Sequence, residues 1–327
     1  MQLVINSRGA YLSKIDERFQ VKLDGVKQEV SAKKVERILI TTSATITTDA
    51  LKLAIENNID IVFLQYNGEP FARLWHSKLG SICTIRRKQL KLSEEKLGTV
   101  LVKSWIIEKM NNQVNHLEKL KVNRSKEKGI ILEDSMAKIK IQIEKIKVYE
   151  DLPIDNIRNN LEGHEGTAAK IYFETLGKVI PAKYSFNGRS RNPAKDYFNC
   201  MLNYAYGILY SKVERGCVIA GLDPYIGIMH TDNYNKTSLI FDLVEKYRIY
   251  MDEVVFSLFS KRMVKENMFD NVDNGFWLNK EGKILLIDSI DKKFDERIRY
   301  NNRLIKIDNI IQYDLHNIAN KILEEVI

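Results

Sequence analysis

The chain has 327 residues, 44% of them hydrophobic, and a formal net charge of +8. This hydrophobic content excludes a disordered chain, and the length allows two domains of roughly 100–200 residues each. The positive charge favours an acidic partner, either nucleic acid or an anionic membrane. We expect no membrane association, because no apolar run reaches the ~18 residues of a membrane span and no basic amphipathic stretch is strongly one-sided. The N-terminus lacks the apolar core of a signal peptide, so we expect a cytoplasmic protein.

Two β-hairpins are predicted in the first part of the chain. Apolar and polar residues alternate over 19–23 and lead into Asp24-Gly25, where glycine accepts the positive φ of a tight turn. A stronger pattern covers 61–66, passes through Asn67-Gly68 and continues over 70–75. The first part of the chain is therefore predicted to be rich in β-strands.

Between the two hairpins we expect one or two strands over 35–46 and a short helix over 49–57. Thr48 or Asp49 is the expected cap of this helix, because both side chains can accept a hydrogen bond from its free backbone N–H groups. Chemically reactive residue types are not clustered here. We interpret residues 1–82 as a β-rich scaffold or association domain.

From about residue 83 onward the pattern becomes helical. Charged and apolar residues alternate at helical spacing from 86 to 117 and again over 130–148, with hardly any glycine or proline. Their mixed charges are typical of solvated helix faces. We therefore predict an α+β protein with a β-rich N-terminal domain, residues 1–82, and a larger all-α C-terminal domain, residues 83–327.

Glu165 is the first candidate for chemistry. It falls on one face of a predicted helix together with Leu161, Ala168 and Tyr172. A carboxylate on such an apolar stripe is costly unless it is paired, so it is expected to bind either a cationic side chain or a ligand. Glycines at 163 and 166 leave room beside it for another backbone or a ligand.

Asp242 and Glu245 form the second candidate group. They are three positions apart on a helix predicted over 238–263, which places them on neighbouring parts of one face. One can bind a metal while the other orients a ligand or a water. Arg248, three residues beyond Glu245, is an alternative partner that would neutralise it.

His230 is the third candidate, and it lies near the start of a predicted loop. Imidazole is a common ligand of transition metals, although a lone histidine is more often an ordinary hydrogen-bonded residue. Glu165, His230 and Glu245 together can bind one divalent cation.

A loop predicted over 184–193 carries Arg189 and Arg191 close to aromatic residues. Arginine suits phosphate recognition and an aromatic ring can stack on a base, so the loop is either a nucleic-acid contact or a plain surface loop. P-loop, Rossmann, Gly-x-Ser-x-Gly and His-Glu-x-x-His patterns are absent from the sequence, and its three cysteines are widely spaced. A nucleotide cofactor, a serine hydrolase and a cysteine metal site are therefore not expected.

Taken in order, these segments resemble the CRISPR-associated spacer-acquisition integrase, an endonuclease family. The matching pieces are Leu161–Gly166 with Ala168–Phe173, Gly188–Pro193 with Asp196 and Asn199, Gly221–Gly227 leading to His230, and Asp242–Glu245 leading to Arg248. The resemblance implies that Glu165, His230 and Glu245 bind Mn²⁺ or Mg²⁺. It implies that Asp242 is a nearby acid that binds through water or orients a ligand.

The same resemblance implies the activity and partners. Short foreign DNA would be inserted into a CRISPR array by attack of its 3′-hydroxyl on a phosphodiester. The chain would form a homodimer through its N-terminal part and bind a small partner protein that bridges two dimers. The expected DNA contacts are Lys170, Arg189, Arg191 and Arg248. Two alternatives stay open: another metal-dependent nuclease that acts on branched DNA in repair, and a non-catalytic nucleic-acid-binding scaffold.

Overall fold

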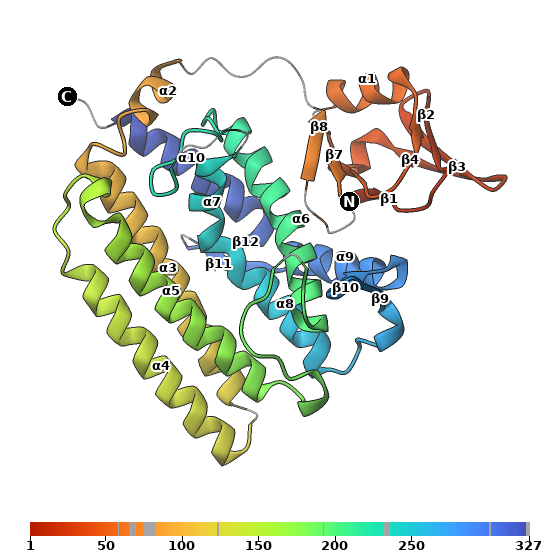
Figure 1. Cartoon of the computed structure of the whole chain (residues 1–327). Helices are drawn as coiled ribbons and strands as arrows, with labels where there is room; N and C mark the ends of the chain where they lie inside the picture. Colours follow the sequence, from red (N-terminus) through yellow and green to blue (C-terminus); the bar gives the residue numbers. More distant parts are fainter. Residues whose placement is uncertain are drawn as a thin grey trace.

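Figure 1 shows a small β-rich part beside a larger helical part. The computed structural model describes residues 1–57, 59–65, 68, 70–74, 83–122, 124–191, 193–231, 234, 236–300 and 302–324. The last strand of the β-rich part ends at Leu74 and the first helix of the helical part begins at Cys83. The predicted division between residues 82 and 83 thus falls at the edge of the described residues. Within the described chain, every helix is too short or too polar to cross a bilayer.

The β-rich part consists of two four-stranded sheets and a short helix, α1 (Thr48–Glu56). In the first sheet the order is β1-β5-β7-β8, with β1, β5 and β7 parallel and β8 antiparallel. In the second sheet the order is β4-β3-β2-β6. The strands are β1 (Gln2–Ile5), β2 (Tyr11–Ile15), β3 (Arg18–Leu23), β4 (Val26–Ser31), β5 (Arg37–Ile40), β6 (Thr45–Ile46), β7 (Asp60–Leu64) and β8 (Pro70–Leu74). A 3₁₀ turn, η1 (Ala32–Lys34), precedes β5.

The predicted hairpins and helix of this part are present. Asp24 and Gly25 have φ of 47° and 80°, the conformation of a tight hairpin turn between β3 and β4. Strands β7 and β8 form the second hairpin, while residues 66, 67 and 75 of that prediction lie outside the described residues. The helix cap is Thr47, one residue before the predicted position, and its hydroxyl accepts the N–H of Ala50 at 3.2 Å.

The C-terminal part is mostly helical, and three of its long helices, α3, α4 and α5, lie side by side (Figure 1). The helices are α2 (Cys83–Gln89), α3 (Lys96–Lys121), α4 (Lys126–Lys147), α5 (Ile154–Val179), α6 (Tyr197–Ile219), α7 (Ser238–Val244), α8 (Arg248–Ser260), α9 (Lys280–Asp295) and α10 (Ile307–Glu324). The 3₁₀ turns are η2 (Ala182–Tyr184), η3 (Glu245–Tyr247) and η4 (Glu266–Met268). The predicted α+β class is confirmed.

Two details of the helical prediction are wrong. The C-terminal part is not purely helical, because it contains two antiparallel hairpins. Their strands are β9 (Phe269–Val272), β10 (Gly275–Leu278), β11 (Arg297–Tyr300) and β12 (Arg303–Lys306). Each strand has four residues, too few for alternation to stand out in the sequence. The helix predicted over 238–263 is also not continuous, because α7 tightens into η3 before α8 begins.

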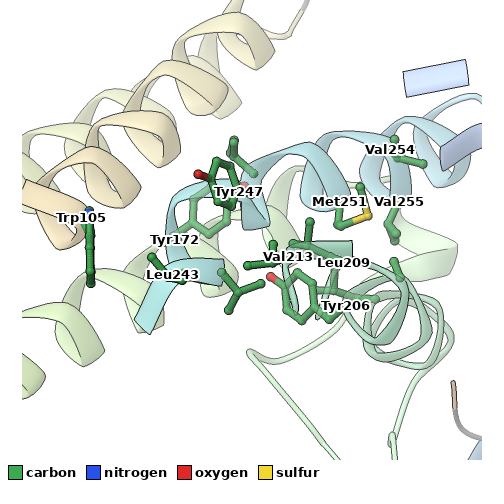
Figure 2. Packing of buried hydrophobic residues seen from close by; sticks show 14 of the residues in the cluster. Trp105, Tyr172, Tyr206, Leu209, Val213, Leu243, Tyr247, Met251, Val254 and Val255 are labelled. Carbon is green, nitrogen blue, oxygen red and sulfur yellow. The ribbon is translucent and has the colours of Figure 1, made fainter. Parts of the chain in front are cut away.

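A large apolar core fixes the helices relative to one another. Figure 2 shows part of it, with Trp105 of α3, Tyr172 of α5, Tyr206 of α6 and Met251 of α8. All four side chains are buried. Close-packed cores resist deformation, so the helices hold the side chains that project away from this core in fixed positions.

The β-rich part is joined to α6 through a buried cluster of charges around Asp60, whose side chain is 0% exposed. Asp60 lies 3.4 Å from Arg37, 3.9 Å from Arg73 and 3.5 Å from Arg215 of α6. Arg73 of β8 also pairs with Glu214 of α6 at 3.0 Å. The ion pairs therefore cross from the sheet to the helical part.

Replacement of Asp60 by asparagine is expected to destabilise the protein by about 3 kcal/mol or more, because three largely buried arginines lose the carboxylate that faces them. Urea denaturation followed by circular dichroism measures this loss. The control is Asp24→Asn, at an exposed turn whose positive φ suits asparagine. Equal denaturation midpoints for the two variants would contradict a stabilising role for the cluster.

Candidate active site

A cavity of about 800 Å³ opens in the helical part between α3, α5, α6 and the α7–η3–α8 segment. Glu165, His230, Asp242 and Glu245 all line it. Its volume lies within the ~300–1,000 Å³ typical of ligand sites. The fold thus brings the four predicted acidic and imidazole residues to one place.

Glu165 reaches the cavity from the middle of α5. Its neighbours on the helix face, Leu161, Ala168 and Tyr172, are fully buried, while the Glu165 side chain remains 24% exposed. Its carboxylate pairs with the ammonium of Lys109 on α3. A Cβ added at Gly166 would meet no described atom within 4 Å, so the space beside Glu165 is open to a ligand.

Glu245 is the first residue of η3, where the chain tightens between α7 and α8. One oxygen lies 2.8 Å from Arg248, and the other, Oε2, lies 2.5 Å from Lys109 without hydrogen-bond geometry. Burial would raise the pKa of Glu245, but Arg248 and Lys109 outweigh it and lower the pKa to about 2. Glu245 is therefore a carboxylate at neutral pH.

Lys109 contacts both carboxylates although it is almost fully buried, with its side chain 10% exposed. Burial opposes its charge, whereas Glu245 and Glu165 favour it, and its pKa is raised above the ordinary value. The ammonium is thus charged and lies between the two acids. Because both pair with one nitrogen, their oxygens are within a few ångström of each other.

Asp242 holds the loop that carries His230. Its carboxylate accepts the backbone N–H groups of Ile228 at 2.7 Å, Met229 at 3.1 Å and His230 at 3.0 Å. The imidazole Nδ1 of His230 lies 2.6 Å from the same carboxylate. Both oxygens of Asp242 are therefore occupied in orienting His230, and Nε2 is the imidazole nitrogen left for another partner.

The electrostatics of His230 follow from this arrangement. Burial lowers its pKa, but the hydrogen bond and charge of Asp242, with Glu245 and Glu162, raise it overall. Gly227 is required nearby, because a Cβ there would lie 2.3 Å from the carbonyl oxygen of His230. The loop is folded tightly around the histidine.

Arg158 and Gln89 also anchor this loop. The sequence analysis did not predict a role for either residue. Arg158 of α5 donates to the carbonyl of Met229 at 2.7 Å, and Gln89 of α2 donates to the carbonyls of Asp223 and Ile226 at 2.7 and 3.0 Å. Arg158 is two helical turns before Glu165. The same helix therefore carries Glu165 and fixes the loop of His230. In the sequence, the only sign of this is that Arg158 and Glu165 are spaced to lie on one face of a helix.

The four basic residues predicted to contact DNA fall into an inward-facing pair and an exposed pair. Arg189 and Arg248 are turned inward. Arg189 donates to Asn199 at 2.6 Å and Asn203 at 2.8 Å, and Arg248 donates to the hydroxyl of Tyr210 at 2.7 Å as well as pairing with Glu245.

Lys170 and Arg191 are exposed at the edge of the cavity, as is Lys236, which was not predicted. Lys170 is 76% exposed and lies 4.0 Å from Glu174. Among the described residues that line the cavity, these three cations are the exposed ones. Of the inward pair, Arg248 neutralises Glu245, and Arg189 holds the amides of Asn199 and Asn203.

The donor set suits a divalent cation, although in the described residues no three His, Cys, Asp or Glu side chains are already arranged as a metal cage. Lys109 explains why these donors are not already arranged around a metal position, because its ammonium pairs with both Glu165 and Glu245. Among the described residues, the buried Oε2 atom of Glu245 has no hydrogen-bond partner. The residues that would hold Mn²⁺ or Mg²⁺ are Glu165, Glu245 and the Nε2 atom of His230.

Comparison with known proteins decides the family. Residues 3–292 match the family described as CRISPR associated protein Cas1. The chain belongs to the Cas1 family. It is 35% identical to CRISPR-associated endonuclease Cas1 1 of Archaeoglobus fulgidus, over 95% of this chain and 93% of that protein. It is 31% identical to CRISPR-associated protein Cas1 3 of Methanobrevibacter ruminantium, over 85% of this chain and 84% of that protein. The predicted resemblance is confirmed.

Solved structures share the Cas1 fold. A Cas1 protein from Thermotoga maritima has a TM-score of 0.82 at 19% identity, and the alignment covers 100% of this chain and 98% of that one. A casposase bound to an integration product has a TM-score of 0.84 at 20% identity, covering 99% and 91%. The order of a β-rich part followed by a mostly helical part is therefore that of known Cas1 structures.

Replacement of Asp242 by alanine is expected to release the His230 loop, because three backbone N–H groups lose their acceptor. Hydrogen exchange at residues 228–230 should become at least about tenfold faster, as measured by mass spectrometry of peptides from this loop. The matched control is Asp223→Ala, which removes an acceptor of the Tyr225 N–H in the same loop. Unchanged exchange at 228–230 in the Asp242 variant would contradict its role in holding the loop.

Proposed function

We propose that this Cas1 protein is a divalent-metal-dependent DNA endonuclease and integrase that inserts short DNA fragments into a CRISPR array. The supporting observation is the convergence of Glu165, His230 and Glu245 on one open cavity from a helix, a loop and a 3₁₀ turn. Such an oxygen, nitrogen and oxygen donor set beside exposed cations is suited to chemistry on a phosphodiester.

The reaction needs no nucleophile from the protein. The 3′-oxygen of the incoming strand forms a new bond to a phosphorus atom at the edge of a repeat, and the bond from that phosphorus to the 3′-oxygen of the repeat strand breaks. The proton of the attacking hydroxyl is lost and the departing oxygen gains one. Because one phosphodiester replaces another, the same site can also run the reaction backwards on branched DNA.

The residues of the cavity have different proposed roles. Glu165, Glu245 and His230 would bind Mn²⁺ or Mg²⁺, and when bound such an ion polarises a phosphate oxygen and stabilises the charge of the transition state. Asp242 keeps Nε2 of His230 directed away from its own carboxylate by holding Nδ1. Arg248 pairs with Glu245 and keeps its carboxylate in place.

The exposed cations at the rim are the proposed contacts with DNA. Lys170, Arg191 and Lys236 can each approach a phosphate, so binding is expected to weaken as salt concentration rises. Arg189 and Arg248 were also predicted DNA contacts, and we now propose for them an indirect role, because their donors hold Asn199, Asn203, Tyr210 and Glu245.

We also propose a homodimer formed through the β-rich part, and a small partner protein that bridges two dimers. A Cas6-RT-Cas1–Cas2 complex contains a chain with a TM-score of 0.80 to this one at 19% identity, covering 99% of this chain and 35% of that one. This supports Cas2 as the class of small partner.

Glu165→Ala is expected to reduce strand transfer by about 100-fold or more, because it removes one of three proposed ligands at the reacting phosphate. The assay incubates labelled duplex DNA with a plasmid that carries a repeat array, in the presence of Mn²⁺, and measures joined product. The control is Glu174→Ala, which lies on the same helix and pairs with Lys170. Strand transfer at the wild-type rate in the Glu165 variant would rule out the proposed site.

A second experiment distinguishes an integrase from a repair nuclease and from a non-catalytic scaffold. Duplexes that end in a 3′-hydroxyl or a 3′-phosphate are compared with the wild-type protein. Joining that requires the 3′-hydroxyl supports an integrase, cleavage without joining supports a repair nuclease, and binding without either reaction supports a non-catalytic scaffold.

A further inference from the structure

Lys109 is a largely buried cation of the cavity that contacts two carboxylates. It lies near the middle of α3, and its ammonium pairs with Glu165, 56 residues away in the chain, and with Glu245. Removing an ammonium from water is costly, and this one is almost completely buried. Its contacts are the same two carboxylates that are proposed to bind a divalent cation.

A lysine and a divalent cation cannot both take the space between these carboxylates without strong repulsion. A cation that binds Glu165 and Glu245 must therefore displace the ammonium or hold it at a distance. Lysine has a flexible four-carbon stem, and the Lys109 side chain itself lines the cavity, so it has space in which to move.

The structure also contains an acceptor for the displaced ammonium. Gln113 lies four residues beyond Lys109 on α3, which places the two side chains next to each other on one helix face. Gln113 lines the same cavity and is 3% exposed, and its Oε1 atom is buried without a hydrogen-bond partner among the described residues. A buried acceptor left unpaired is costly, so a second arrangement of Lys109 would satisfy it.

We propose that Lys109 is a positioning residue that takes the place of the divalent cation in the free protein and moves to Gln113 when the cation binds. The inference rests on the proposed function, because it assumes that Glu165 and Glu245 are metal ligands. In the free protein the ammonium keeps the two carboxylates together despite their repulsion. On binding, the cation takes over that role and Lys109 transfers its hydrogen bond to Gln113.

Binding of Mn²⁺ alone, followed by electron paramagnetic resonance at fixed pH and salt, tests the exchange without any DNA. Lys109→Met is expected to bind Mn²⁺ at least about tenfold more tightly than the wild type, since a competing unit charge at ion-pair distance has been removed. Lys109→Gln, which is one atom shorter but keeps a polar end, is a second variant that should bind more tightly.

Thermal unfolding provides a readout that is independent of the resonance signal. Without metal, Lys109→Met is expected to unfold at a lower temperature than the wild type, because two close carboxylates lose their shared counterion. Added Mn²⁺ should raise its unfolding temperature by more than it raises that of the wild type. The matched control is Lys103→Met on the same helix, which pairs with Asp151 outside the cavity and should leave Mn²⁺ affinity unchanged.

Gln113→Leu tests the destination of the ammonium. This variant is expected to bind Mn²⁺ several-fold more weakly, because the displaced lysine loses its acceptor. In the Lys109→Met background the same change should have no effect, since there is no ammonium left to accommodate. Equal effects of Gln113→Leu in both backgrounds would overturn the proposed destination.

The outcomes also separate this inference from the proposed function. If Glu165→Ala abolishes Mn²⁺ binding but Lys109→Met binds Mn²⁺ equally or more weakly than the wild type, the metal site stands and the exchange is overturned. If the wild-type protein binds no Mn²⁺, both are overturned. Tighter binding by the Lys109 variants together with loss of binding in Glu165→Ala supports both.

Discussion

The site depends on the neutralisation of two carboxylates that the fold forces together. Glu165 arrives on α5 and Glu245 on η3, and both pair with the single ammonium of Lys109. Two such charges repel each other where they are partly removed from water, so the cations stabilise the arrangement in which α3, α5 and η3 meet here. Arg248 completes the balance at Glu245. The arrangement therefore has the electrostatics of a metal site, with side chains as the cations.

A second buried cluster of charges lies at the junction between the β-rich part and the helical part. Asp60 faces Arg37, Arg73 and Arg215 at the junction of the sheet with α6. There the cations are planar guanidinium groups, and Asp60 is completely buried. Around Glu165 the cation is instead a flexible lysine beside open space. The Asp60 cluster is suited to holding two parts of the chain together, and the cluster around Glu165 to exchanging one cation for another.

Local patterns predicted the elements well, because their causes are local. The Asp24-Gly25 turn needs positive φ, and Glu165 shares its helix face with buried residues four and seven positions away. The family motifs then selected the residues that line the cavity. The partners of these residues were not predictable in the same way. Nothing near Lys109 in the sequence indicates Glu165, and the inward turn of Arg189 depends on Asn199 and Asn203 of a different element.

Arg189 and Arg248 are bound to groups of the protein itself, and this affects how the net charge should be interpreted. A net charge of +8 favours an acidic partner, but several of the cations at the cavity are bound to carboxylates, amides and carbonyl groups of the protein itself. Buried pairs of this kind are screened little by salt, whereas exposed side chains such as Lys170 are screened strongly. The inner cations therefore support the geometry of the site with little dependence on salt, and the exposed ones on the rim are the residues proposed to attract DNA. Net charge favours a polyanionic partner, while burial separates the side chains that could reach it from those paired within the protein.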